Sequence, residues 1–315
     1  MKNSAIILTL LYVVLSCGGR KASSTTPATD VVTPEFCADS AYNYIKAQTD
    51  FGPRVPNTDA QQNCAAWLMT KLKEFGAETF LQGFETVTFD KTRIRGYNII
   101  GSYNPESPTR IILCSHWDSR PWADNDPDPA NWMKPVDAAN DGASGVAVLL
   151  QLARQLKESG TTLGIDIVLV DAEDMGENDN EDSWGLGAQY WAEHPHVAGY
   201  KPLFGILLDM VGSEDATFTR EYYSMQYANG FVDLVWKCAA GSHFINAQGG
   251  AVTDDHIFIN RAGIPCIDII DMRSDSETGF CPEWHTVDDT IGNISPATLA
   301  EVGQTLLNVI AQLEQ

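Results

Sequence analysis

The chain has 315 residues, and 44% of them are apolar, which is enough to bury a sizeable core in one α/β domain. Its 20 Lys and Arg residues stand against 42 Asp and Glu residues, so the formal net charge is −22. This charge repels nucleic acid and anionic membrane surfaces on average, and we expect neither as a direct partner of the folded domain.

The first residues have the pattern of an export signal. A short basic region over residues 1–3 precedes an apolar run over residues 5–15, which is too short to span a bilayer. Val14-Leu15-Ser16-Cys17 has the shape of a lipoprotein cleavage site. We therefore predict a lipoprotein signal peptide over residues 1–16 and an acylated Cys17 at the start of the mature protein. A simple secretory signal cleaved near the same point is the alternative.

Residues 17–35 are rich in Gly, Ser, Thr and Pro, which predicts a flexible tether. The tether would hold a domain of residues 36–315 off a membrane surface, so we expect a monomeric, exported bacterial lipoprotein that is periplasmic or anchored at the outer membrane. Six cysteines follow Cys17, and an exported location permits disulfides without indicating which pairs form. The sequence has no Cys-x-x-Cys pair, so ligation of zinc by cysteine is not supported.

A capping box at Thr58-Asp59-Ala60-Gln61 predicts the start of a helix. Apolar residues then recur at helical spacing and stop at Gly76. The same spacing predicts a helix over residues 146–156 and a last helix that begins at Ser295-Pro296 and runs to Leu313.

Four short runs are rich in β-branched residues and are apolar at both odd and even positions. This pattern is typical of strands that are buried on both faces. They cover residues 110–114, 165–170, 204–208 and 264–270. Helical patterns lie between them, and the domain contains no further linker or repeat. The fold class is therefore α/β, with a single domain and a central, mostly parallel (mixed) twisted sheet that carries helices on both faces.

Polar side chains lie at the ends of these predicted strands. The residues are His116 and Asp118, Glu173 and Asp174, Asp209, and Asp268 with Asp271. In an open α/β sheet the carboxyl ends of the strands form the ligand crevice, so we expect these side chains in one site. Any single carboxylate could instead cap the next helix.

A glycine-bracketed turn presents a further carboxylate. The segment Ala138-Ala139-Asn140-Asp141-Gly142-Ala143-Ser144-Gly145 places Asp141 just before the predicted helix over residues 146–156. Asn-Asp-Gly is also a common structural turn, so on its own it indicates no function. Together with the strand-end carboxylates and with His285 near the end of the chain, it supplies the residue types that bind zinc.

The order of these motifs resembles that of the zinc-dependent aminopeptidase superfamily and, in detail, that of the type II (animal-type) glutaminyl cyclases. The resemblance covers roughly residues 36–315. The segments that carry it are Ser115-His116-Trp117-Asp118-Ser119, Leu208-Asp209-Met210-Val211-Gly212, Asp254-Asp255-His256-Ile257 and Trp284-His285-Thr286-Val287-Asp288-Asp289.

Carried over residue by residue, the resemblance implies one zinc ion per chain held by Asp141, Asp174 and His285, with Glu173 as the acid/base. It also implies that Asp209 and Asp254 are acidic partners of that Glu. The aromatic walls of the substrate pocket would be Trp284 and Trp184. The sequence departs from the animal pattern at two positions. Asp174 stands where those enzymes normally have Glu, and Asp268 stands where they usually have His.

The activity that the resemblance implies is that of a glutaminyl-peptide cyclotransferase, which converts the amino-terminal Gln of peptides or proteins to pyroglutamate and releases ammonia. Two carboxylates and a neutral imidazole suit this reaction, because they cancel the charge of zinc and leave one tetrahedral position for a neutral amide oxygen. A shielded carboxylate such as Glu173 can accept the proton of the α-amine and later protonate the departing ammonia.

Two other interpretations remain open. A two-zinc exported aminopeptidase would use His116 and Asp209 for a second metal, with Asp141 as the bridge. A lipoprotein that only binds peptides on an inactive enzyme scaffold is the non-enzymatic alternative, although the intact acid, base and ligand residue types count against it. One zinc ion per chain favours the cyclase, and two favour the aminopeptidase.

Overall fold

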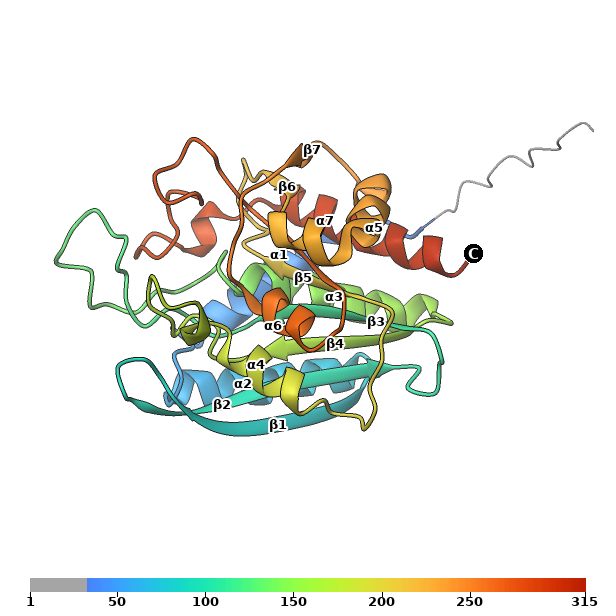
Figure 1. Ribbon diagram of the computed structural model, residues 1–315, viewed down its shortest axis with the longest axis horizontal. Helices are drawn as coiled ribbons and strands as arrows, with labels where there is room; N and C mark the ends of the chain where they lie inside the picture. Colours follow the sequence, from blue (N-terminus) through green and yellow to red (C-terminus); the bar gives the residue numbers. More distant parts are fainter. Residues whose placement is uncertain (1–32) are drawn as a thin grey trace, which may run out of the picture. The chain divides into compact units, whose positions relative to one another are not determined.

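The computed structural model describes residues 33–315 and is built around a six-stranded mixed sheet with the strand order β1-β2-β4-β3-β5-β8 (Figure 1). The predicted signal peptide, Cys17 and the tether up to residue 32 lie outside the described residues. The last part of the predicted tether contacts the domain: the Thr33 hydroxyl donates a hydrogen bond to Asn308 Oδ1 at 2.9 Å. The described chain therefore enters the domain along its last helix.

The four predicted strands are present, and they are mutually parallel in the centre and at one edge of the sheet. They are β3 (Arg110–His116), β4 (Gly164–Val170), β5 (Gly205–Asp209) and β8 (Cys266–Ile270). Two antiparallel strands, β1 (Glu78–Val87) and β2 (Arg93–Tyr103), extend the sheet beyond β4. A separate pair of short parallel strands is formed by β6 (Phe218–Arg220) and β7 (Phe244–Gln248). The predicted mostly parallel, mixed sheet is thus confirmed.

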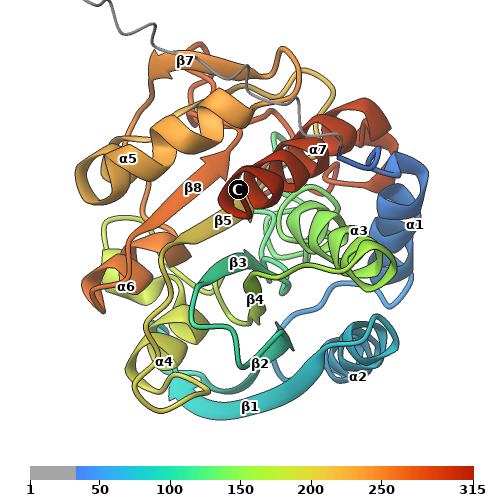
Figure 2. The same ribbon diagram turned by 90° about the vertical axis from the view of Figure 1, so that its right-hand side faces the viewer.

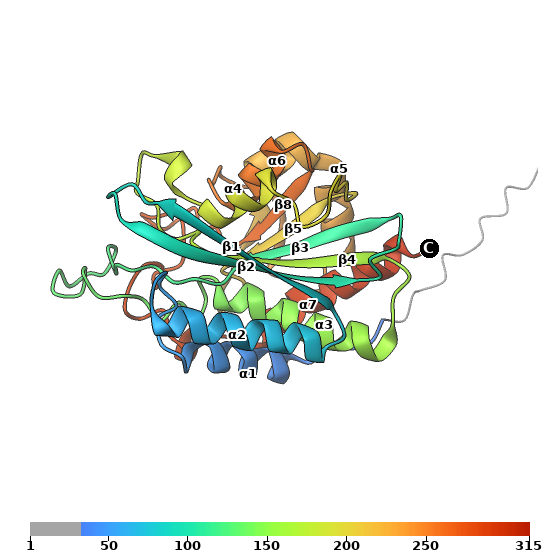
Figure 3. The ribbon, with the colours of Figure 1, turned by 90° about the horizontal axis from the view of Figure 1, so that it is seen from below.

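Helices cover both faces of the sheet (Figures 2 and 3). One face carries α1 (Ala38–Thr49), α2 (Asp59–Glu74), α3 (Ala143–Ser159) and α7 (Pro296–Leu313). The other face carries α4 (Leu186–Glu193) and α6 (Asp255–Arg261), and α5 (Tyr222–Cys238) packs against β8 and α7. Short 3-10 turns lie at η1 (Glu181–Ser183) and η2 (Ile291–Asn293).

The predicted helix starts follow from their capping residues. The Thr58 hydroxyl accepts a hydrogen bond from the Gln61 amide at 3.2 Å, and Ser295 caps α7 in the same way ahead of Pro296. Such caps satisfy amide groups that a helix cannot pair internally. Leu68 is fully enclosed where α2 packs against β1 and β2, and Leu306 is fully enclosed where α7 packs against α1, α3 and α5. The predicted patterns therefore identify real core helices.

The described residues contain neither a membrane-spanning helix nor a disulfide. No helix within residues 33–315 is both long and apolar enough to cross a membrane. The six cysteines from Cys37 onward are free thiols, so none of the permitted disulfides forms in the described domain.

Candidate active site and metal centre

The strand-end residues meet at the carboxyl edge of the parallel strands. His116 is the last residue of β3, Glu173 and Asp174 follow β4, and Asp209 is the last residue of β5. Their side chains are almost completely buried. The topology thus brings together residues that are far apart in the sequence, at the edge where α/β sheets bind ligands.

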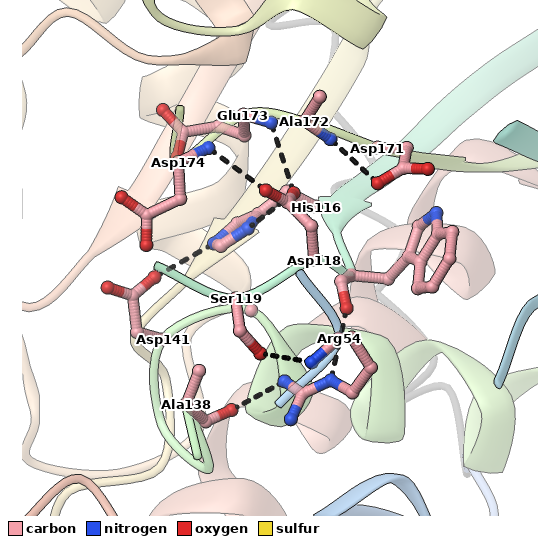
Figure 4. Close-up of polar contacts among 12 residues, drawn as sticks. Arg54, His116, Asp118, Ser119, Ala138, Asp141, Asp171, Ala172, Glu173 and Asp174 are labelled. Carbon is pink, nitrogen blue, oxygen red and sulfur yellow. Dashed lines mark hydrogen bonds and ion pairs between the residues drawn. The ribbon is translucent and has the colours of Figure 1, made fainter. Parts of the chain in front are cut away.

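The turn that carries Asp141 is held on both of its sides. The Asp289 carboxylate accepts hydrogen bonds from the amides of Asn140 at 2.7 Å and Asp141 at 3.0 Å. The buried Arg54 guanidinium donates to the carbonyl oxygen of Ala138 at 2.8 Å (Figure 4). Backbone held at this many points fixes the direction of the Asp141 side chain.

Glycine is required directly after Asp141. Gly142 has φ 89°, and a Cβ atom there would lie 2.8 Å from His116 Cε1. Both the left-handed backbone and the close approach of the imidazole exclude a side chain. The Asn-Asp-Gly turn therefore has a structural role, and it also places the Asp141 carboxylate in the site.

Asp118 fixes the turn that carries the acidic pair. Its two carboxylate oxygens accept hydrogen bonds from the amides of Glu173 at 3.0 Å and Asp174 at 3.2 Å (Figure 4). The preceding residue, Ala172, has φ 56°, a left-handed conformation that is unusual for a residue other than glycine. This turn directs Glu173 and Asp174 to different positions although they are adjacent in the sequence.

Asp141, Asp174 and His285 form a cluster that fits a metal ion. Each offers a buried ligand atom within 4.8 Å of the other two, and His285 Nε2 lies 3.1 Å from Asp174 Oδ1 and 3.5 Å from Asp141 Oδ2. Asp174 Oδ2 is buried and has no hydrogen-bond partner among the described residues. An unpaired buried carboxylate oxygen is costly unless a cation neutralises it. Two carboxylates and an imidazole are suitable zinc ligands.

Two further groups within residues 33–315 have the spacing of metal ligands. They are His116 with Asp141 and Asp209, and Asp254 with His256 and Asp268. The second of these lies behind the site, where His256 Nε2 is 3.2 Å from Glu221 Oε2. Burial and the neighbouring Asp254 raise the pKa of the Asp268 carboxyl group well above its usual value.

Glu173 has the environment of a buried general acid or base. Burial raises the pKa of its carboxyl group well above the usual value, and the negative charges of Asp254 and Asp174 raise it further against the opposing effect of His116. Burial and the charge of Asp209 likewise raise the pKa of Asp254 to about 7. Raised pKa values in a buried group of acids are typical of sites that transfer protons.

A cavity of about 270 Å³ opens over these groups. Trp184 and Trp284 both line it, and the Trp184 ring stacks beside the His285 ring with centroids 6.2 Å apart. Sequence reasoning missed Phe280, which also lines the cavity and lies 4.5 Å from the Trp284 ring centroid. No local pattern distinguishes Phe280 from a core residue. Asp271, which the sequence pattern placed with the site residues, has a structural role instead. Its carboxylate accepts hydrogen bonds from the Thr217 amide and from the Arg273 guanidinium.

The affinity for zinc should depend on pH through His285. Burial lowers the pKa of this imidazole, but the Asp174 carboxylate and the hydrogen bond with Asp124 outweigh that effect and raise it to about 9. Zinc binds the neutral ring, so a proton must leave below this pH. We expect the apparent zinc Kd to fall by about tenfold per pH unit between pH 6.5 and about 9, measured by chelator competition. A Kd that does not change over this range would contradict the assignment of His285 as a ligand.

The chain is similar to known proteins in sequence and in fold. Residues 98–310 match the model of peptidase family M28. A glutaminyl cyclase of Bacteroides thetaiotaomicron is 50% identical, with a TM-score of 0.86 over 89% of this chain and 99% of that chain. A Zn-dependent exopeptidase of Parabacteroides distasonis is 47% identical, with a TM-score of 0.87 over 89% of this chain and 99% of that chain.

The similarity extends to animal proteins. The glutaminyl-peptide cyclotransferase of Drosophila melanogaster is 24% identical over 78% of this chain and 73% of its own length. The fold, the strand-end carboxylates and these matches agree on one assignment. The chain belongs to peptidase family M28, among the members that resemble the bacterial glutaminyl cyclases.

Proposed function

We propose that the protein is a zinc-dependent glutaminyl-peptide cyclotransferase, which acts on peptides or proteins with an amino-terminal Gln and releases ammonia. The observation that carries this proposal is the cluster of Asp141, Asp174 and His285 beneath a small cavity walled by Trp184 and Trp284. The cavity has a volume of about 270 Å³, which is small for a ligand pocket and suits a small group such as the Gln side chain. The 50% identity to a bacterial glutaminyl cyclase supports the same reaction.

When bound by Asp141, Asp174 and His285, zinc supplies a Lewis acid for the γ-carbonyl oxygen of the substrate. The residues of the chain do the remaining work. The two indole rings orient the Gln side chain so that its γ-carbon meets the α-nitrogen. Glu173 accepts a proton from the α-amine as the new carbon–nitrogen bond forms, and it returns that proton to the amide nitrogen that leaves as ammonia.

We further propose that one zinc ion binds per chain. His116 Nε2 lies 3.0 Å from Asp141 Oδ1 and 3.1 Å from Asp209 Oδ1. Burial lowers the pKa of His116, but hydrogen bonds with Asp118, Asp141 and Asp209 raise it well above its usual value. His116 is therefore already held by three carboxylates, which supports a role as a partner of these acids rather than as the ligand of a second metal.

Replacing His116 with Ala tests this count. We expect the variant to keep its one zinc ion, with activity changed only through packing and the loss of the contacts to Asp141 and Asp209. Metal content per chain, measured on purified wild-type and variant protein, gives the answer. Two zinc ions in the wild type and one in the variant would contradict the single-zinc proposal.

A two-zinc aminopeptidase is the second candidate function. It is favoured by the spacing of His116, Asp141 and Asp209, which matches a second metal site, and by the similarity to a Zn-dependent exopeptidase. Incubation of the purified domain with a Gln-initiated peptide and with a leucine anilide separates the two activities. The cyclase releases ammonia from the peptide and leaves the anilide intact, whereas the aminopeptidase releases aniline.

We also propose that the protein is an exported bacterial lipoprotein, anchored through Cys17 and monomeric. The motif Val14-Leu15-Ser16-Cys17 supports the export and the lipid anchor. Replacing Cys17 with Ser is expected to release the protein from the membrane fraction, or to leave its signal uncleaved, while the catalytic rate of the domain stays unchanged. Fractionation and mass spectrometry of the variant measure both outcomes. A cleaved variant that stays in the membrane fraction would contradict the lipid anchor.

A further inference from the structure

Arg120 is a buried cation at the metal-ligand cluster, two residues after Asp118 in the sequence. Its side chain is almost completely enclosed, with 3% of the residue exposed. The guanidinium Nη1 donates hydrogen bonds to the carbonyl oxygens of Gly176 at 2.9 Å and Asp174 at 3.1 Å, and it lies 3.4 Å from Asp174 Oδ1. Arg120 therefore holds both the backbone and the carboxylate of one proposed zinc ligand.

The other side of the guanidinium reaches a second ligand through Asp124. Nη2 and Nε of Arg120 form a fork with the two oxygens of the Asp124 carboxylate, at 2.6 Å and 3.2 Å. Asp124 Oδ1 in turn lies 3.4 Å from His285 Nδ1, while His285 Nε2 faces Asp174. A hydrogen bond to the outer nitrogen of a ligating imidazole sets the orientation of the ring. One side chain thus acts on Asp174 directly and on His285 through one carboxylate.

Arg120 also supports the wall of the cavity. Its guanidinium carbon lies 4.9 Å from the Trp184 ring centroid and 5.3 Å from the Trp122 ring centroid, so two indole rings flank the cation. The Trp184 ring packs directly on Gly176, where an added Cβ would lie 2.2 Å from it. Arg120 binds the carbonyl of this same glycine. The position of the Trp184 ring therefore depends on Arg120 through the indole itself and through the backbone beneath it.

We propose that Arg120 is a positioning residue that joins the metal ligands to the substrate pocket. It fixes Asp174 and His285 for zinc and holds Trp184 as the pocket wall; the zinc ligands and the role of Trp184 in binding substrate both rest on the proposed function. Lysine cannot replace it. An ammonium group has the charge but lacks the planar fork that pairs with Asp124 while also reaching two carbonyl oxygens and stacking between two indoles.

The test is Arg120→Lys beside a matched control, Arg110→Lys. Arg110 is partly buried and also forms a fork with a carboxylate, with Nε and Nη2 at 2.7 Å and 2.9 Å from the Asp166 oxygens, but it lies at the opposite end of β3. We expect Arg120→Lys to raise the zinc Kd by about 10 to 100-fold in chelator competition. With zinc at saturation, we expect it to raise KM for a Gln-initiated peptide more than it lowers kcat. We expect Arg110→Lys to lower Tm and to leave the zinc Kd and KM unchanged.

Asp124→Asn separates the effect of Arg120 on the metal ligands from its effect on the pocket wall. It weakens the orientation of His285 but leaves the Trp184 stack, so we expect a raised zinc Kd and an unchanged KM. An unchanged zinc Kd in Arg120→Lys, or an equal rise in Arg110→Lys, would overturn the inference. The zinc measurement needs no turnover, so it still decides the role of Arg120 if the protein does not cyclise Gln. Should Arg120→Lys fail to fold, the change in zinc Kd of Asp124→Asn decides the link to His285 alone.

Discussion

Replacing Glu173 with Gln is expected to lower kcat on the order of 10² to 10⁴-fold while the zinc content stays that of the wild type. The amide keeps the size and hydrogen-bonding capacity of the side chain but cannot accept the proton of the α-amine. Burial and the charges of Asp254 and Asp174 raise the pKa of Glu173, which is the property that the amide removes. Steady-state kinetics and metal analysis of the same preparation measure both quantities.

The adjacent acid supplies the control for this result. Asp174→Asn should lose zinc, because its carboxylate lies 3.1 Å from His285 Nε2 and carries an unpaired buried oxygen. If Glu173→Gln loses zinc and Asp174→Asn keeps it, the roles of the two residues are reversed. If both variants keep zinc and activity, neither residue takes part in catalysis.

Removing the metal is expected to abolish activity, and adding Zn²⁺ is expected to restore it. In the proposed site Asp141, Asp174 and His285 hold the zinc ion, and no protein side chain can act as a Lewis acid in its place. Bound zinc also stabilises the folded state, by about 2.7 kcal/mol when free zinc is about 100 times its Kd. Activity and Tm should therefore fall and recover together across a chelation and reloading series.

A chelator that is already saturated with zinc provides the control, because it must leave both quantities unchanged. Full activity in a preparation shown to be free of metal would rule out the zinc-dependent mechanism. Recovery of Tm without recovery of activity would show that zinc has only a structural role.

The strands that support the site could be predicted because they are buried on both faces. Every residue of β4 is buried, and such a strand reads as a continuous apolar run. The edge strand β1 behaves differently. Most of its residues are exposed or half-buried, and polar residues interrupt it, so its sequence carries no comparable signal. Its place in the sheet depends on its pairing with β2, which is a tertiary property.

The site residues at the ends of strands could be predicted, because the sheet topology sets their positions. The site residues whose roles depend on contacts between loops could not be predicted. Polar residues at the ends of parallel strands must meet at one edge, so Glu173 and Asp209 could be placed from the sequence pattern. Arg120 and Asp124 could not, because their roles depend on the loop after β3 packing against the segment of His285. One contact that joins them is the hydrogen bond from the Asn125 amide to the His285 carbonyl at 3.1 Å. Local spacing contains no information about such a contact.

The most direct test of the proposed reaction follows the products of a single Gln-initiated peptide by mass spectrometry. The cyclase and the aminopeptidase act on the same amino terminus of this peptide, but they break different bonds. We predict a peptide of unchanged length that has lost one ammonia, formed by the zinc-loaded wild type and not by Glu173→Gln. A peptide shortened by one residue, together with free Gln, would contradict the proposed cyclase activity.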